Sequence, residues 1–251
     1  MQCRYREQIY VAGDYMTVSL YPVFCAGRKR RGRFKATSDV QQRLNEHNAR
    51  EHVARLLHAN FTEEDVWLHL TFDDAHLPEG KAGVLRAFRN FKGRLGRAIK
   101  REQGEELKYV AIPEGTPGGE RFHIHMVTNA RLTAATLAAL WGQGFIRIDP
   151  LKFGPYGLTG LSEYMQKGHA FARILRSRNL EDPAPVEKTG RVSRSEAARI
   201  CDEAWDHPEK FNELYPGWAA SAVRPFYNNF NRYFYLRVYL YRPKGGAARA
   251  V

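Results

Sequence analysis

The chain has 251 residues, of which 43% are hydrophobic, an ordinary share for a globular protein. It contains no apolar run near the ~20 residues that a membrane helix requires, and no apolar signal segment at its N-terminus. Three widely spaced cysteines form no C-x-x-C pair, which indicates reduced thiols. We therefore expect a cytoplasmic protein without membrane contact. The 39 Lys and Arg outnumber the 27 Asp and Glu, and this net charge of +12 favours a polyanionic partner.

The positive charge is concentrated in two segments. Residues 28–35 form a basic block without apolar periodicity, which indicates a solvated loop, and the second set, at residues 86–101, contains no acid between its ends. From both segments we take as candidate phosphate contacts Arg28, Lys29, Arg30, Arg31, Arg86, Arg89, Lys92 and Arg97.

Two elements are predicted ahead of the central region. Alternating apolar residues over 8–24 indicate a hairpin, and the spacing over 40–58 predicts a helix with Asp39 as a possible N-cap. We assign residues 1–60 to an N-terminal region made of this hairpin, the basic loop and the helix.

The central region, residues 61–180, alternates between strand and helix patterns. Strands are predicted at 66–72, 107–112, 121–128 and 145–148, and helices at 81–102, at 132–141 and from Gly157 to about Lys167. The resulting order is β-α-β-β-α-β-α, whose first six elements are those of the split βαβ, ferredoxin-like arrangement. We therefore expect an α+β fold with an antiparallel sheet and helices on one face.

The C-terminal region, residues 181–251, begins with a Pro-rich linker at 181–185. A capping box at Ser193–Glu196 opens a helix that runs to about Trp205, and residues 231–242 alternate as a late strand with tyrosines on one face. We expect this region to pack on the core. Its tyrosines could stack on unpaired bases or pack under a neighbouring element.

His123 and His125 are the clearest candidate functional residues. They lie two apart on a predicted strand, so both imidazoles project from one face and can converge on one divalent cation. Imidazole and carboxylate ligands would suit Mg²⁺ or Mn²⁺ with open positions for phosphate oxygens. A pair of polar residues on a solvated sheet face is the alternative interpretation.

A third ligand could come from either of two residues. If the predicted hairpin places Ile112 opposite His123 and Glu114 opposite Arg121, then Glu114 shares the face of the histidines, whereas a slip of one residue would remove it. His69 competes, because its strand would neighbour the His-x-His strand in a ferredoxin-like sheet. We favour Glu114.

Tyr164 and Lys167 stand three residues apart on the last helix of the central region, so they project from one side of it. A tyrosine hydroxyl, with a pKa of about 10, is a poor nucleophile at neutral pH. A nearby ammonium group or a metal-bound phosphate can activate the reaction. Because Tyr-x-x-Lys is a common pattern, a tyrosine packed beside a surface lysine is the alternative.

In this order the motifs resemble those of HUH-type rolling-circle replication initiators, and in detail the filamentous-phage replication proteins. Three segments are similar to the first strand motif, the metal motif and the nucleophile helix: Leu68-His69-Leu70-Thr71-Phe72, Phe122-His123-Ile124-His125-Met126 and Tyr164-Met165-Gln166-Lys167. Supporting segments are Tyr109 to Glu114, Trp141 to Gly144 and Ser177 to Leu180. A second tyrosine one helical turn from Tyr164, as two-tyrosine mechanisms need, is absent.

The resemblance implies a DNA-nicking enzyme of a phage or plasmid in a bacterial host. The metal would be held by His123, His125 and Glu114, and Tyr164 would form a 5′-phosphotyrosine and release a 3′-hydroxyl, with Lys167 stabilising the charged groups. The implied partners are single-stranded or hairpin origin DNA and the host DNA polymerase and helicase.

Other functions are compatible with parts of this pattern. A relaxase or single-strand transposase would use the same chemistry. A histidine-triad hydrolase needs a third histidine where Val127 stands. A non-catalytic, RNA-recognition-like module should present aromatic side chains where His123 and His125 lie.

Overall fold

A computed structural model describes residues 3–24, 39–166, 174–190, 192–207, 209–228 and 232–243. In this part of the chain the strands form two antiparallel five-stranded sheets accompanied by helices, which confirms the α+β class. The chain divides into two compact units. Unit 2 consists of residues 60–153 and 158–181, and unit 1 of residues 1–59, 154–157 and 182–251.

Unit 2 contains the central elements predicted from the sequence. Its sheet has the order β6-β3-β5-β4-β7, so sequential strands β3 and β4 are separated by β5. This interleaved order supports the ferredoxin-like interpretation. The elements, in chain order, are β3 (Val66–Thr71), the 3-10 turn η1 (Asp74–His76), α2 (Lys81–Gln103), β4 (Tyr109–Glu114), β5 (His123–Thr128), α3 (Ala134–Trp141), β6 (Ile146–Pro150), α4 (Thr159–Met165) and β7 (Leu175–Arg176).

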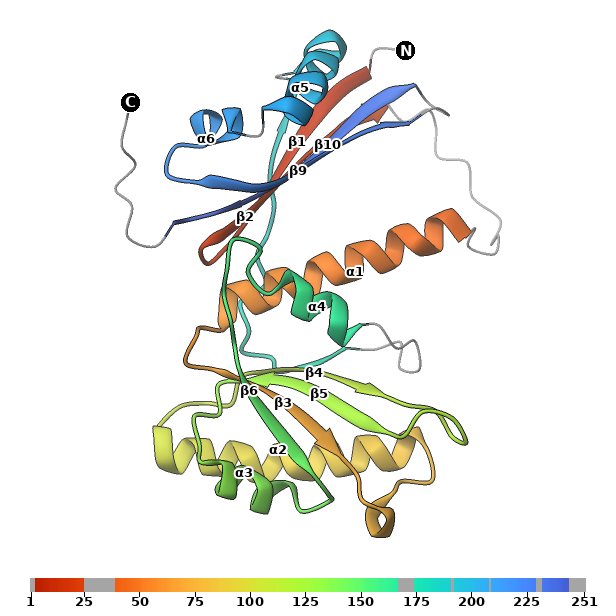
Figure 1. Ribbon diagram of the computed structural model, residues 1–251, viewed down its shortest axis with the longest axis vertical. Coiled ribbons are helices and arrows are strands. Elements are labelled where there is room, and N and C mark those ends of the chain that lie inside the picture. Colours follow the sequence, from red (N-terminus) through yellow and green to blue (C-terminus); the bar gives the residue numbers. More distant parts are fainter. Residues whose placement is uncertain are drawn as a thin grey trace. The chain divides into compact units, whose positions relative to one another are not determined.

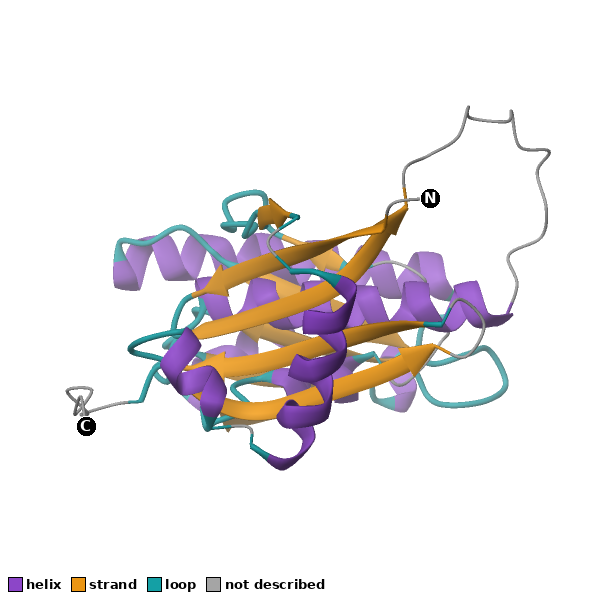
Figure 2. Cartoon of the chain, turned by 90° about the horizontal axis from the view of Figure 1, so that it is seen from above, coloured by secondary structure: helices purple, strands orange, loops and turns teal. Residues whose placement is uncertain are grey.

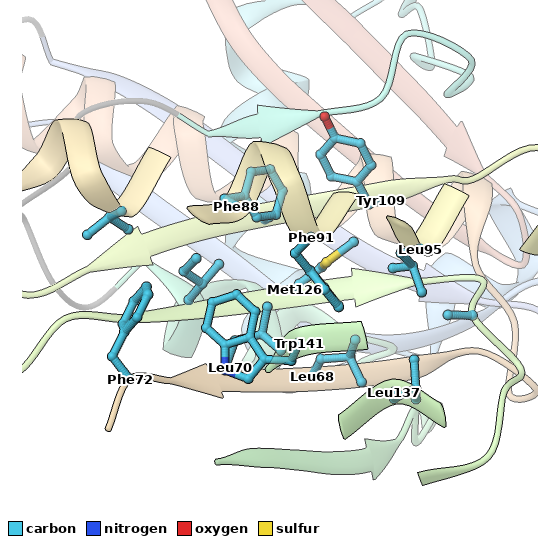
Figure 3. Close-up of a cluster of buried hydrophobic side chains, with 14 of the residues drawn as sticks. Leu68, Leu70, Phe72, Phe88, Phe91, Leu95, Tyr109, Met126, Leu137 and Trp141 are labelled. Carbon is cyan, nitrogen blue, oxygen red and sulfur yellow. The ribbon is translucent and has the colours of Figure 1, made fainter. Parts of the chain in front are cut away.

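The core of unit 2 lies between its sheet and two helices. Apolar residues recur on α2 at intervals of three and four, so Phe88, Phe91 and Leu95 lie on one buried stripe. They pack against Leu68, Met126 and other strand residues of the same sheet face, and Trp141 of α3 fills the end of this cluster (Figure 3). In unit 2, α2 and α3 therefore cover one face of the sheet, while α4 lies over the other (Figure 1).

The Trp-Gly-x-Gly segment at 141–144 has a structural explanation. The Trp141 side chain is fully buried, and its indole N–H donates to the Thr71 carbonyl at 2.8 Å. Gly142 ends α3 in the left-handed conformation at φ 57°. Gly144 has φ 145°, and a Cβ there would lie only 2.5 Å from the Asp73 backbone nitrogen. The segment thus lets the chain leave α3 and run close against the end of β3.

Unit 1 combines the two ends of the chain. Its sheet has the order β8-β1-β2-β10-β9, so strands from the N-terminal and C-terminal regions, treated separately in the sequence analysis, pair directly (Figure 2). The elements are β1 (Cys3–Ala12), β2 (Tyr15–Phe24), α1 (Asp39–Asn60), β8 (Val186–Thr189), α5 (Arg194–Asp206), α6 (Lys210–Leu214), β9 (Ala219–Asn228) and β10 (Tyr233–Tyr241). The capping box of Ser193 and Glu196 is present at the start of α5. Strand β9 was not predicted, because its Pro225 argues against a central strand, and β9 is an edge strand where proline is tolerated.

Helix α1 packs on the tyrosine-bearing face of this sheet. The Tyr239 hydroxyl donates to the Glu51 carboxylate at 2.9 Å, and Arg237 contacts His47. The Arg55 guanidinium stacks over the Tyr10 ring at 4.0 Å. At Tyr239 the alternative interpretation is therefore correct, since this side chain packs under α1 and is not open for base stacking.

Candidate metal and nucleophile site

The two histidines of the His-x-His motif lie on the sheet face opposite the α2 core. Ile124 and Met126 between and after them point into that core, so His123 and His125 project from the other face. Pairing with β3 places His69 beside His125, and pairing with β4 places Glu114 beside His123. Three strands thus bring their polar side chains to one area of the sheet.

The β4–β5 register differs from the predicted one by two residues. Glu114 lies opposite His123, not Arg121, and Ile112 lies opposite His125, not His123. The turn, closed by a hydrogen bond from the Thr116 N–H to the Glu120 carbonyl at 2.9 Å, comes later than the expected register requires. Because side chains alternate with a period of two, a shift of two residues leaves Glu114 on the face of the histidines.

Glu114, His123 and His125 form a compact group of potential metal ligands. Oε2 of Glu114 lies 3.3 Å from Nε2 of His123 and 3.6 Å from Nε2 of His125. One ligand atom from each residue lies within 4.8 Å of the others. Glu114 and His125 are buried, with 5% and 2% of their surface exposed, and His123 is half-buried. A buried carboxylate facing two imidazoles is a favourable place for a cation.

Hydrogen bonds orient the His123 ring toward this group. Its Nδ1–H donates to the Arg121 carbonyl at 2.9 Å, which leaves Nε2 directed at Glu114. The hydrogen bond to Glu114 raises the pKa of His123 above its usual value and outweighs the opposite effect of burial. Nδ1 of His125 is buried and has no hydrogen-bond partner among the described residues. Both rings thus keep a nitrogen available to a ligand.

His69, the competing third ligand, lies beside this group but does not belong to it. Its ring contacts that of His125 edge-on, with centroids 4.5 Å apart. In the described part of the chain only Glu114, His123 and His125 gather their ligand atoms closely enough to hold one cation. Burial, with a smaller contribution from His125, lowers the pKa of His69 to about 4, so this imidazole is neutral at physiological pH.

Tyr164 of α4 lies over the same sheet face. Its ring centroid is 5.4 Å from that of His125 and 6.3 Å from that of His69. Ser162 and Met165 are buried and anchor the short helix, whereas half of the Tyr164 surface, 50%, is exposed. The structure therefore brings the predicted nucleophile, 39 positions beyond His125 in the sequence, next to the histidine rings while leaving it accessible.

Trp67 is a residue of this site that the sequence analysis missed. Its ring lies 4.0 Å from His69 and contacts Tyr164 edge-on at 5.5 Å. It stands two positions before His69 on the same strand, so the alternation that placed the histidines could have placed Trp67 with them. Next to these residues on β6, Arg147 and Asp149 form an ion pair at 2.9 Å.

The remaining predicted residues lie elsewhere. Lys167 and the basic residues Arg28, Lys29, Arg30 and Arg31 lie outside the described residues. The candidate phosphate contacts of the second basic segment are on α2, which covers the opposite face of the sheet from Glu114, His123 and His125: Arg86, Arg89, Lys92 and Arg97.

Comparison with known families agrees with the resemblance seen in the motifs. Residues 65–169 match the model of a family of replication-associated proteins, the ORF2 group. This segment runs from just before β3 to just after α4 and so contains every residue of the candidate site. Searches of curated proteins and of solved structures give no match. None of the helices in the described ranges is long and apolar enough to cross a membrane.

Proposed function

We propose that the protein is a phage or plasmid replication initiator that nicks single-stranded origin DNA with Tyr164 as the nucleophile. The observation that carries the proposal is the contact between the Tyr164 and His125 rings, 5.4 Å apart, beside a buried carboxylate and two imidazoles. The match of residues 65–169 to a replication-associated family supports the biological context. In this context the partners are single-stranded or hairpin origin DNA and the host polymerase and helicase.

Glu114, His123 and His125 would hold a divalent cation, Mg²⁺ or Mn²⁺. Ligand bonds to such small cations are about 2.0–2.2 Å long, which places neighbouring donor atoms about 3 Å apart. The 3.3 Å between Glu114 and His123 is close to this spacing. A bound cation would polarise the scissile phosphate and offset its negative charge.

The reaction itself requires only atoms of Tyr164 and of the DNA. The phenolic oxygen of Tyr164 forms a bond to the phosphorus, and the bond from phosphorus to the 3′ oxygen breaks. The phenolic proton leaves Tyr164, and the departing 3′ oxygen gains a proton, so the products are a 5′-phosphotyrosine and a 3′-hydroxyl that a polymerase can extend. Trp67 and His125 hold the Tyr164 ring from the sheet side. In this proposal Lys167 stabilises the charged groups.

A covalent adduct tests this function. The protein is incubated with Mn²⁺ and a pool of single-stranded and hairpin-forming oligonucleotides, and the products are separated under denaturing conditions. We expect an adduct and a shortened DNA ending in a 3′-hydroxyl for the wild type and none for Tyr164→Phe. Tyr227→Phe, which changes a 43% exposed tyrosine in unit 1, serves as the matched control and should retain the adduct. An adduct that persists in Tyr164→Phe would disprove the nucleophile assignment.

The binding-module alternative is tested in the same assay. His123→Ala should lose nicking but keep DNA binding, because the imidazole belongs to the proposed chemistry. If the wild type binds single-stranded nucleic acid and gives no adduct with any oligonucleotide or cation, a non-catalytic binding function replaces the proposal.

A further inference from the structure

Three arginines on the outer face of α2 form a stripe of unopposed positive charge. Arg86, Arg89 and Arg97 are exposed, and within the described ranges no hydrogen bond or ion pair engages any of them. At 100° per residue, positions 86, 89 and 97 lie within one narrow sector of the helix, on the side opposite the buried Phe88 and Leu95. From Lys81 to Arg101 the helix contains no acidic residue that could neutralise this stripe.

The other cations of α2 already have partners. Arg94 donates to the carbonyls of Leu140 and Trp141, at 2.8 and 3.2 Å, at the C-terminal end of α3. Lys100 pairs with Glu106 at 2.9 Å, and Arg101 pairs with Glu102 at 2.8 Å. Lys92 lies 5.8 Å from the Tyr109 ring centroid. The three unopposed arginines therefore differ from their neighbours in their contacts as well as in their position.

The stripe lies on the side of unit 2 away from the candidate nicking site. The buried side of α2 packs on Leu68 and Met126, whose strands present His69 and His125 on the opposite face. In Figure 1, α2 and α4 lie on opposite sides of this sheet. A polyanion bound by the stripe is therefore separate from the DNA segment that would lie at Glu114, His123 and His125.

The chemistry of the stripe identifies the form of nucleic acid it would bind. Single-stranded DNA is held by cations together with aromatic side chains on which bases stack. The two aromatic residues of α2, Phe88 and Phe91, are buried, so the stripe offers only charge. In a duplex the bases are stacked within the helix and the phosphates face outward. A straight helix of 23 residues, about 34 Å long, is also suited to such a rod.

We propose that Arg86, Arg89 and Arg97 bind the phosphate backbone of double-stranded DNA without sequence preference. This inference goes beyond the proposed nicking function, because it assigns a second DNA surface and a different form of DNA. It does not depend on Tyr164 or on a metal. In an initiator this surface would hold the duplex beside the single strand that is cut.

Salt-dependent binding to a duplex of unrelated sequence, about 20 base pairs long, tests the proposal. The logarithm of the binding constant is plotted against that of the salt concentration, and each phosphate contact contributes a slope of about −0.9 for duplex DNA. For R86Q/R89Q/R97Q we expect a slope smaller by about 2–3 and at least a tenfold loss of affinity at low salt. The matched control, K100Q/R101Q, removes two paired cations of the same helix and should change the slope by less than one contact.

Two results would overturn the proposal. One is a triple variant that keeps the duplex affinity and slope of the wild type, and the other is an equal loss per charge in the control, which would indicate only the effect of net charge. Circular dichroism and a thermal unfolding curve establish that both variants are folded. Tyr164→Phe should bind the duplex like the wild type, so a failure of the nicking proposal is distinguished from a failure of this one.

Discussion

Glu114 and His123 lie directly opposite each other on the antiparallel strands β4 and β5, with Oε2 of the carboxylate 3.3 Å from Nε2 of the imidazole. Each residue therefore fixes the position of the other through backbone pairing. His125, two residues further along β5, completes the group without any distortion of the strand.

Loss of the Glu114 carboxylate should weaken metal binding. Glu114→Gln removes the one anionic member of the group, and we expect the Mn²⁺ affinity to fall at least tenfold in isothermal titration calorimetry, since changes at outer-shell partners alone reduce affinity about 10–100-fold. His69→Gln, at a histidine on the same sheet face, should stay within about threefold of the wild type. Equal losses in the two variants would mean that His69 is a ligand and that the assignment of Glu114 as the sole third ligand is wrong.

Metal binding should also depend on pH through His123. The hydrogen bond to Glu114 raises the pKa of His123 above 6.5, and a protonated imidazole cannot bind a cation. As the pH falls through this raised pKa, protons compete with the metal, so the affinity should be high at pH 8 and low at pH 6. NMR titration of the metal-free protein should give a lower His123 pKa in Glu114→Gln than in the wild type. An unchanged pKa would contradict the coupling.

The chain after α3 should tolerate a side chain at Gly144 poorly. A Cβ at this position would lie 2.5 Å from the Asp73 nitrogen and 2.7 Å from the Thr71 carbonyl oxygen, both backbone atoms. We expect Gly144→Ala to reduce the free energy of unfolding by about 2–4 kcal/mol. At Gly142 the φ of 57° is also left-handed, but the nearest atom is 3.6 Å away, so Gly142→Ala should cost only about 1 kcal/mol. Denaturant unfolding measures both, and equal effects would argue against the close approach at Gly144.

His58 should make the stability of the protein pH-dependent. The His58 ring stacks on Tyr15 with centroids 4.2 Å apart, and burial lowers its pKa to about 3. The unfolded chain takes up a proton near pH 6.5, whereas the folded one does so only near pH 3. Stability from this group is therefore full above pH 6.5 and is lost as the pH falls toward 3, by at most about 1.4 kcal/mol per pH unit. Urea unfolding at pH 7 and pH 5 should show a smaller difference for His58→Gln than for the wild type. The same difference in both would exclude His58 as the source.

Much of unit 2 could be predicted because its signals are local. The period of three and four on residues 81–102 and the alternation around His123 identify helix α2 and strand β5 with boundaries close to the observed ones. The face of Glu114 was predicted although the register was not, since a shift of two residues preserves the face. The position of Tyr164 depended on the resemblance, because no local pattern specifies where a short helix packs.

What could not be predicted arises from contacts distant in sequence. The pairing of β10 with β2 joins residues more than two hundred positions apart, and nothing in either strand names its partner. Burial of Tyr239 against Glu51 likewise depends on where α1 packs. The sidedness of the basic helix was not foreseen either, because the sequence shows that α2 is basic but not that its sheet carries the histidines on the far face.

The central claim is that Tyr164 becomes covalently linked to DNA beside the metal group. The most direct measurement is mass spectrometry of the proteolysed adduct formed with Mn²⁺ and a cleaved single-stranded oligonucleotide. The proposal predicts a nucleotide attached through a 5′-phosphate to the peptide that contains Tyr164. Attachment at any other residue, or strand cleavage without a covalent protein–DNA product, would contradict it.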